Sequence, residues 1–425
     1  MSLVSRNRLL SIILFCIWPL GIALFACYQM SKRRDFLFYA ILFSLFVGLY
    51  GYVFNARHDL TIDMVRIYNH YEMLRPMNFV EGIPYFVLRG DLSLFLLWLL
   101  GRMGGNAQIV GFFVAFLSCF SFIYIFDKWM CLLKIRDYNK LFIISVLTFF
   151  ITIHPTYISG VRTPIALALF LLGFICFFSG KKRLSFLFCI LSILNHFSMI
   201  FTVFLFVICI CFDERTVRKL SFILACSGAF YHSLMNGFLY LLSFAGVIGT
   251  LLSGKINYYV FGDLAEGEVR IATGSNIWYI QLFAVLGVYL LIQISPRVKQ
   301  RILENKYISK LDVWILLLIG FVLLNISNIT MIARFSSLVI FFCYLLIVSV
   351  VGMYRNAFFV KLFYVLFCVF FLVAFIALIK EHGAIPEFQI AYQNTHKLLS
   401  YNLFQLLDID VDYVDIAKQN LLIDE

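Results

Sequence analysis

Arginines stand where the polar stretches of this chain meet its apolar runs, and arginine is the side chain best suited to bind a phosphate. Arg162 and Pro164 precede the apolar run 165–178, and Arg334 precedes another such run. A guanidinium group makes paired hydrogen bonds with phosphate oxygens and stays charged at any working pH. These residues predict a pyrophosphate pocket; the alternative is that they snorkel to lipid headgroups. The predicted pyrophosphate- or substrate-binding residues are Arg57, Tyr68, Arg162, Arg270 and Arg334.

Two further side chains can move a proton. Asp63 lies in the segment 57–71, which is predicted to be a helix, and His196 interrupts a long apolar stretch. A carboxylate or an imidazole can accept the proton of an attacking hydroxyl group. The alternatives are an ion pair between Asp63 and Arg66, and a structural hydrogen bond from His196 to a neighbouring helix. Asp63 and His196 are the predicted catalytic residues, and the ring of Tyr68 is suited to stack on a sugar.

The sequence contains no pattern typical of a nucleotide or metal enzyme. Glycine-rich phosphate loops and the His-Glu-x-x-His zinc pattern are absent. Asp408, Asp410 and Asp412 form an Asp-x-Asp-x-Asp pattern, but such spacing is common in acidic tails. Most of the 11 cysteines lie in apolar runs without a Cys-x-x-Cys pair, which favours small buried apolar residues over ligands or disulfides. We predict no cofactor and no metal site.

Composition indicates an integral membrane protein. Hydrophobic residues make up 63% of the 425 residues and charged residues only 13%, and several apolar runs reach the roughly 20 residues that span a bilayer. The formal net charge of +11 comes from Lys and Arg in short loops between these runs, which is the pattern of topology signals and argues against nucleic acid as a partner. We predict an all-α, polytopic transmembrane helical bundle at 1–380 and a polar, acidic, periplasmic tail at 381–425.

The bundle is expected to have about 10–12 membrane segments, including re-entrant or periplasmic helices. The predicted segments are 9–28, 36–53, a short re-entrant or interfacial helix at 92–100, 109–126, 141–158, 165–178, 277–294, 313–326, 336–351 and 362–379. Basic clusters mark the cytoplasmic ends. The triplet Lys32-Arg33-Arg34 outweighs the basic residues before the first segment, so the N-terminus is predicted to lie outside. A short external turn is predicted at 328–334.

The stretch 184–211 has two interpretations. It is apolar throughout except at Asn195-His196, and basic residues flank both of its ends. Two basic flanks favour an even number of crossings, which predicts a shallow hairpin that turns near His196. The alternative is one long crossing, followed by two crossings within 220–251. Hydropathy does not choose between them.

Several short patterns, in this order, resemble the EpsG-like branch of the Wzy polysaccharide polymerases of the bacterial inner membrane. They comprise an external Asp-x4-Tyr helix (Asp63, Tyr68), a helix-opening arginine (Arg162), His-Phe-Ser at 196–198 and Arg-Phe-Ser at 334–336. Arg162 also precedes Gly173 by ten residues, which is similar to the Arg-x10-Gly pattern of Wzy loops. The family commonly has Gln after the helix-opening arginine, whereas this chain has Thr163.

This resemblance implies glycosyl transfer at the periplasmic face of a multi-pass protein of the bacterial inner membrane. The donor would be a glycan on undecaprenyl pyrophosphate, and the acceptor a lipid-linked repeat unit of O-antigen or a related surface polysaccharide. Arginines would stabilise the departing pyrophosphate, and Asp63 or His196 would take the acceptor's proton. The implied partners are undecaprenyl-pyrophosphate-linked oligosaccharide, membrane lipid and a chain-length regulator.

Three other functions remain open from the sequence. An O-antigen ligase-type transferase usually has one large periplasmic loop, whereas the external stretches here are moderate. A flippase or transporter of lipid-linked glycans predicts internal repeats and charges along a central path. No clear repeat is found, and most charges lie at the membrane rims. A membrane acyltransferase would use His196 as its catalytic residue.

Overall fold

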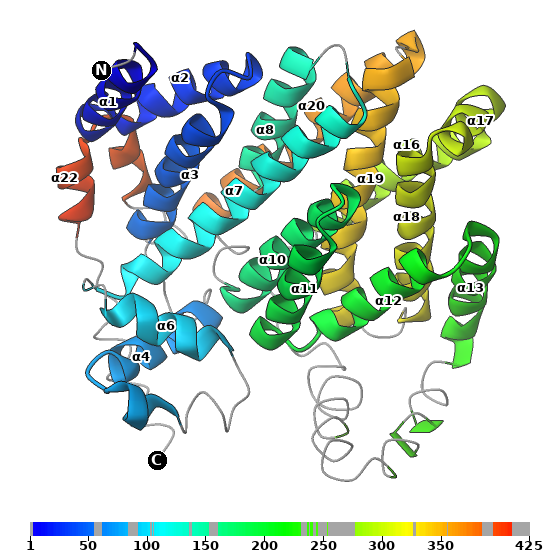
Figure 1. Ribbon diagram of the computed structural model, residues 1–425, viewed down its shortest axis with the longest axis horizontal. Helices are drawn as coiled ribbons and strands as arrows, with labels where there is room; N and C mark the ends of the chain where they lie inside the picture. The colour runs from blue at the N-terminus through cyan, green and yellow to red at the C-terminus, as the bar shows by residue number, and fades with distance from the viewer. Residues whose placement is uncertain are drawn as a thin grey trace. The chain divides into compact units, whose positions relative to one another are not determined.

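The computed structural model describes residues 3–54, 62–83, 92–102, 104, 106–135, 138–152, 160–230, 277–325, 329–354, 356–384 and 394–409, with a few positions between 236 and 253. Every regular element in these residues is a helix (Figure 1), so the all-α prediction is confirmed. The chain forms two compact units. Unit 1 comprises residues 1–203 and 380–425, and unit 2 comprises residues 204–379. The domain limits predicted from the sequence stay predictions.

The helices are distributed over both units. Those of unit 1 are α1 (Leu3–Ile17), α2 (Pro19–Ser31), α3 (Phe36–Val53), α4 (Ile62–Leu74), α6 (Leu92–Arg102), α7 (Gln108–Leu132), α8 (Tyr138–Thr152), α10 (Arg162–Phe178), α11 (Lys182–Asn195), the 3-10 helix η2 (Thr395–Leu399) and α22 (Leu403–Leu407). Those of unit 2 are α13 (Glu214–Ser227), the 3-10 helix η1 (Gly228–Phe230), α16 (Ile277–Ile294), α17 (Pro296–Glu304), α18 (Lys306–Leu324) and α19 (Ile329–Tyr354). Helices α12 (Met199–Cys211) and α20 (Ala357–Ala384) cross the unit boundaries.

Several helices have the length and composition of membrane spans. Within the described residues, four are long and apolar enough to cross a bilayer, in α3, α7, α18 and α19, and α16 with α17 makes a fifth if this bent pair is one span. The pair bends by 88°, at Ser295 before Pro296, where the ring of proline removes a helical hydrogen bond. Shorter apolar helices lie in α1, α10, α12 and α20. The polytopic class is confirmed, and the number of crossings stays a prediction.

The N-terminal segment corrects one prediction. The expected single crossing at 9–28 is broken at Trp18, where Pro19 begins α2. Arg8 Nη2 lies 2.7 Å from Asp35 Oδ1, 27 residues further along the chain, whereas a straight helix would separate them by about 40 Å. The segment therefore folds back on itself, and the N-terminus lies on the same side as Lys32-Arg33-Arg34. An outer N-terminus and a cytoplasmic triplet are therefore incompatible, and the membrane side of each stays a prediction.

A second contact joins two basic segments of unit 1. Helix α7 continues past the predicted end at 126 to Leu132, so Asp127 lies in the helix rather than in a loop. Its buried carboxylate is 3.9 Å from Arg33 Nε and 3.4 Å from Lys128 Nζ. The segments 32–34 and 127–134 therefore lie at the same end of unit 1, as their common cytoplasmic assignment requires.

Helices α3 and α7 pack backbone to backbone in unit 1. A Cβ atom on Gly51 would overlap the carbonyl group of Gly111 and lie 2.8 Å from the Cβ of Ala115. Small residues permit such an approach, and membrane helices commonly associate in this way because lipid provides no hydrophobic drive. The α3–α7 contact fixes the end of α7 near which α4 and α6 pack.

We expect Gly51→Ala to destabilise the protein by about 1–3 kcal/mol, because the added methyl group has to push two helix backbones apart. Thermal unfolding in detergent measures the effect. The matched control is Gly287→Ala in α16, where the added Cβ would meet no neighbouring atom within 4 Å among the described residues. Ala in that helix interior should be neutral or slightly stabilising. Equal melting temperatures for the two variants would contradict the tight α3–α7 contact.

The C-terminal segment 394–409 packs against the first helices of unit 1. Trp18 Nε1 donates to Leu399 O at 3.2 Å, and Tyr52 Oη donates to Leu407 O at 3.1 Å. The buried Gln108 side chain donates to Tyr52 O and Ile409 O, both at 3.0 Å. Because Tyr52 ends α3 and Gln108 begins α7, α22 lies at the end of unit 1 that the sequence assigns to the outside.

In unit 2, α13 runs parallel to α18. Arg218 Nη2 binds Asp312 Oδ2 at 2.7 Å, and Ser221 Oγ binds Leu316 O one turn further along both helices. Both helices therefore begin on the same side. Since α18 follows the basic helix α17, that side is the predicted cytoplasmic one.

The start of α19 differs from the prediction. Residues 328–334 were expected to form an external turn, but the helix already begins at Ile329, so Arg334 lies inside its second turn. The predicted crossing 277–294 coincides with α16, and the structure extends the predicted 313–326 back to Lys306. Asn305 makes that extension possible, because its side chain accepts hydrogen bonds from the amides of Tyr307 and Ile308.

Candidate functional site

Helix α10 begins at Arg162 itself, as the sequence predicts. Pro164 lies in the first turn, where its missing amide proton has no helical partner to lose. The preceding residue, Val161, is buried with φ 26°, a left-handed backbone angle that is rare and costly for a β-branched residue. This strained turn sets the position of Arg162, whose side chain is half-buried.

Helix α11 runs antiparallel beside α10 (Figure 1). Gly173 permits the close approach, because a Cβ there would already be 3.2 Å from Ser185 O. Ser192 Oγ donates to Ala166 O at 2.7 Å near the other end of the pair. The hairpin therefore has a tight, defined register along its whole length.

Asn195 brings the end of α11 to the start of α10. Its side chain is 1% exposed, and Nδ2 donates to the backbone carbonyl of Arg162 at 2.7 Å. Its Oδ1 atom is also buried and has no hydrogen-bond partner in the part of the chain that the structure describes. A buried acceptor without a partner is costly, so a hydroxyl group or amide of a bound molecule would be stabilised there.

His196 follows directly and ends α11 in an extended conformation. Its ring is nine-tenths buried, and Nδ1 lies 2.6 Å from Ser198 Oγ and 3.3 Å from the Ser198 amide nitrogen. The Ser198 amide donates to Nδ1, which favours the form in which Nδ1 accepts; in the other form Nδ1 donates a hydrogen bond to Ser198 Oγ, and the Nε2 lone pair is available as a base. When Nδ1 is the acceptor, Nε2 carries the proton and donates. Ser198 thus controls which of the two chemistries the ring offers.

The break at His196 also bears on the topology of 184–211. Helices α11 and α12 have 14 and 13 residues, or about 20 Å each, which is less than the roughly 30 Å of a bilayer core. Cations mark both far ends: Lys181 precedes α11, and Lys310 Nζ donates to Cys209 O at the end of α12 at 3.3 Å. The helix lengths are compatible with the shallow hairpin, and the choice between the two topologies stays a prediction.

The structure therefore brings together two predicted site residues, Arg162 and His196, through Asn195. Ser198 and Asn195 had no predicted role, although both flank His196 in the sequence. Tyr68 lies in α4, which packs on α6, and α6 in turn contacts α11. Its side chain is fully buried, so stacking on a sugar would require α4 to move; that role stays a prediction.

The side chains of the remaining predicted residues lie outside the part of the chain that the structure describes. Asp63 lies in the first turn of α4, but its side chain and that of Arg66 are outside the described residues, as is the side chain of Arg334. Arg57 and Arg270 also lie outside the described residues. Arg334 belongs to unit 2, whereas Arg162 and His196 belong to unit 1. A pocket shared by the arginines stays a prediction.

Comparison with known proteins gives the family. The model of the EpsG family matches residues 12–394, which is most of the chain and includes Arg162, Asn195, His196 and Ser198. No curated protein and no solved structure matches the chain. The family match indicates a polysaccharide polymerase-type activity in general terms, and the apolar helices place that activity in a membrane protein. On this evidence, the chain belongs to the EpsG family.

Proposed function

We propose that the protein polymerises oligosaccharide repeat units linked to undecaprenyl pyrophosphate, at the periplasmic face of the bacterial inner membrane. A hydroxyl group of one lipid-linked repeat unit attacks the anomeric carbon of the glycan on a second lipid. The new glycosidic bond forms as the bond to the pyrophosphate oxygen breaks. The proton of the hydroxyl group passes to a base, and undecaprenyl pyrophosphate leaves with the electron pair.

The observation that carries this proposal is the Arg162–Asn195–His196 cluster. The buried Asn195 side chain donates to the backbone carbonyl of Arg162, which joins the start of α10, where the half-buried Arg162 lies, to the end of α11, where the buried His196 follows. Negative charge grows on the leaving pyrophosphate, so a fixed cation stabilises the transition state more than the ground state. Arg162 is assigned to the pyrophosphate.

The two neighbouring residues fit the acceptor. His196 takes the proton at Nε2 in the tautomer in which Nδ1 donates to Ser198 Oγ rather than accepting from the Ser198 amide. Asn195 Oδ1 accepts a hydrogen bond from a sugar hydroxyl group. Asp63 remains a second candidate base, since its side chain lies outside the described residues. In the shallow-hairpin interpretation, the cluster would lie below the membrane surface, within reach of a polyprenyl pyrophosphate group anchored in lipid.

The test is a purified preparation in lipid nanodiscs supplied only with lipid-linked repeat units. We expect products of two or more units without any nucleotide sugar, resolved by gel electrophoresis or mass spectrometry. Strict dependence on a nucleotide sugar would overturn the proposal. Movement of the lipid across a bilayer without lengthening would indicate the flippase alternative, and transfer only to added lipid A core would indicate the ligase alternative.

A further inference from the structure

The first two turns of α13, in unit 2, present three cations, at positions 215, 218 and 219. Asp213 caps the helix, since its carboxylate accepts from the Thr216 amide at 3.0 Å and from Thr216 Oγ1 at 2.6 Å. This fixes the start of the helix, from which Arg215, Arg218 and Lys219 extend. One turn later the exposed side chains become apolar: Phe222 is 71% exposed and Ile223 is 56% exposed.

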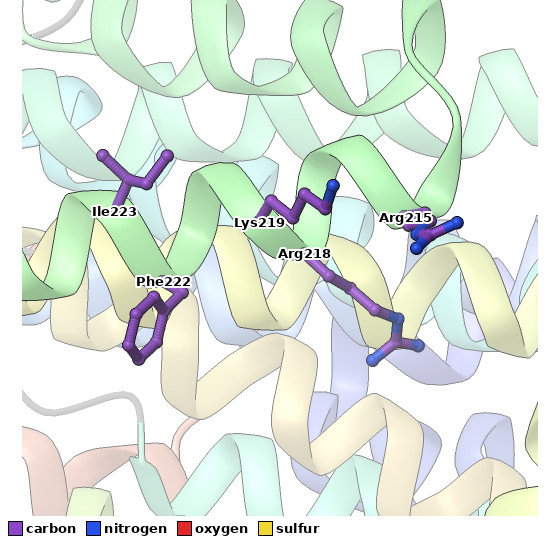
Figure 2. Close-up of a pocket in the computed structure, with 5 residues that line it drawn as sticks. All are labelled: Arg215, Arg218, Lys219, Phe222 and Ile223. Carbon is purple, nitrogen blue, oxygen red and sulfur yellow. The ribbon is translucent and has the colours of Figure 1, made fainter.

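These five residues line a surface hollow of about 610 Å³. Figure 2 shows Arg215, Arg218 and Lys219 at one end of the lining and Phe222 and Ile223 at the other. Cationic and apolar lining therefore meet within one helical turn, as at the border between lipid headgroups and acyl chains.

Nearby carboxylates are already engaged. Glu214 Oε2 accepts from Ser309 Oγ at 2.6 Å, and the Asp213 carboxylate is bound to Thr216. Asp312 is 2% exposed and accepts from Arg218 at 2.7 Å and from Tyr289 Oη at 2.9 Å. Hydrogen bonding to the Thr216 side chain also lowers the pKa of Asp213 from its ordinary value.

The cations differ in their roles. Arg218 is anchored on Asp312, whereas Arg215 and Lys219 have no acidic partner among the residues that the structure describes. Unit 2 holds this end of α13 firmly, because Gly320 of α18 lies so close to Ser221 that a Cβ would overlap its carbonyl. Among the described residues, Arg215 and Lys219 thus lie without an acidic partner on a firmly packed helix, beside the candidate membrane span α18.

We propose that this hollow binds an anionic phospholipid of the inner leaflet. Its phosphate group is held between Arg215 and Lys219, with Arg218 as the anchored third donor, and one acyl chain follows Phe222 and Ile223. A basic cluster next to exposed apolar side chains fits a ligand that is anionic at one end and apolar at the other. A free phosphate would use only half of this lining. The site is separate from the Arg162 cluster and does not depend on the polymerase proposal.

Native mass spectrometry of the full-length protein tests the proposal, after reconstitution in equal amounts of phosphatidylglycerol and phosphatidylethanolamine. We expect the wild type to retain phosphatidylglycerol selectively. The double variant Arg215→Gln/Lys219→Gln should bind it about 30-fold more weakly, because each cation near a membrane surface is equivalent to about fivefold in affinity. Arg218 is left unchanged because its loss would strand the buried Asp312.

The matched control is Arg297→Gln/Lys299→Gln on α17, which removes the same charge from exposed residues of the same unit. It should retain phosphatidylglycerol like the wild type. Equal loss in both double variants would indicate a diffuse electrostatic effect and overturn the site. Phe222→Ala tests the apolar part of the proposed site. This variant should retain phosphatidylglycerol less selectively than the wild type does. The lipid assignment would be overturned by two results together: millimolar inorganic phosphate displaces the lipid, and Phe222→Ala retains phosphatidylglycerol as the wild type does. Together they would indicate a site for a free anion.

Discussion

Replacing Arg162 with Ala should reduce the rate of chain elongation by about 100-fold or more, because a positioned charge at a developing anion commonly contributes that much. Arg162→Lys should recover part of the rate, since an ammonium group keeps the charge but loses the paired geometry. The assay is elongation of lipid-linked repeat units by purified protein. In cells, the expected result is single repeat units in place of long chains.

The lower elongation rate of Arg162→Ala should reflect a slower reaction step rather than a less stable fold. Asn195 binds the backbone carbonyl of Arg162, so replacing the side chain leaves that hydrogen bond in place and the melting temperature nearly unchanged. The matched control is Arg183→Ala, an exposed arginine at the opposite end of the same hairpin, which should elongate normally. If Arg162→Ala still gives the wild-type distribution of chain lengths on a gel, Arg162 does not take part in the reaction.

Replacing His196 with Ala or Gln should lower kcat by about 100-fold or more, within the range of general-base catalysis. The pH profile separates this role from a structural one. A base works only when unprotonated, so wild-type kcat/KM should fall as the pH drops below the pKa of the imidazole. This acid limb should disappear in His196→Gln, because an amide cannot take a proton.

Ser198→Ala provides an independent test of the same assignment. In the base mechanism, Ser198 Oγ, 2.6 Å from Nδ1, stabilises the imidazolium form that arises after proton transfer. Removing it should change the pH at which the acid limb begins, because the imidazole loses a hydrogen-bond partner. His396→Gln, an exposed histidine of η2, is the control and should leave the profile unchanged. An unaltered profile in both His196 variants would assign the base to another residue, with Asp63 first.

The sequence by itself determined the class of protein and several element positions. Helix α16 coincides with the predicted segment 277–294, and α10 begins at the predicted Arg162. The interruption at Asn195-His196 also lies where the sequence predicts it. These features depend on residues close together in the chain, because an apolar run, a proline in the first turn and a polar pair act locally.

Only the tertiary structure decided how these elements meet. The ion pair between Arg8 and Asp35 shows that the predicted first crossing folds back on itself. The hydropathy of the sequence does not indicate this contact. Asn195 reaches the carbonyl of Arg162 across 33 residues, since that contact requires α10 and α11 to pack at one register. Side-chain hydrogen bonds between distant segments depend on packing that local composition does not encode. For this reason, Arg162 and His196 were predicted separately from the sequence, and their neighbourhood became visible only in the folded hairpin.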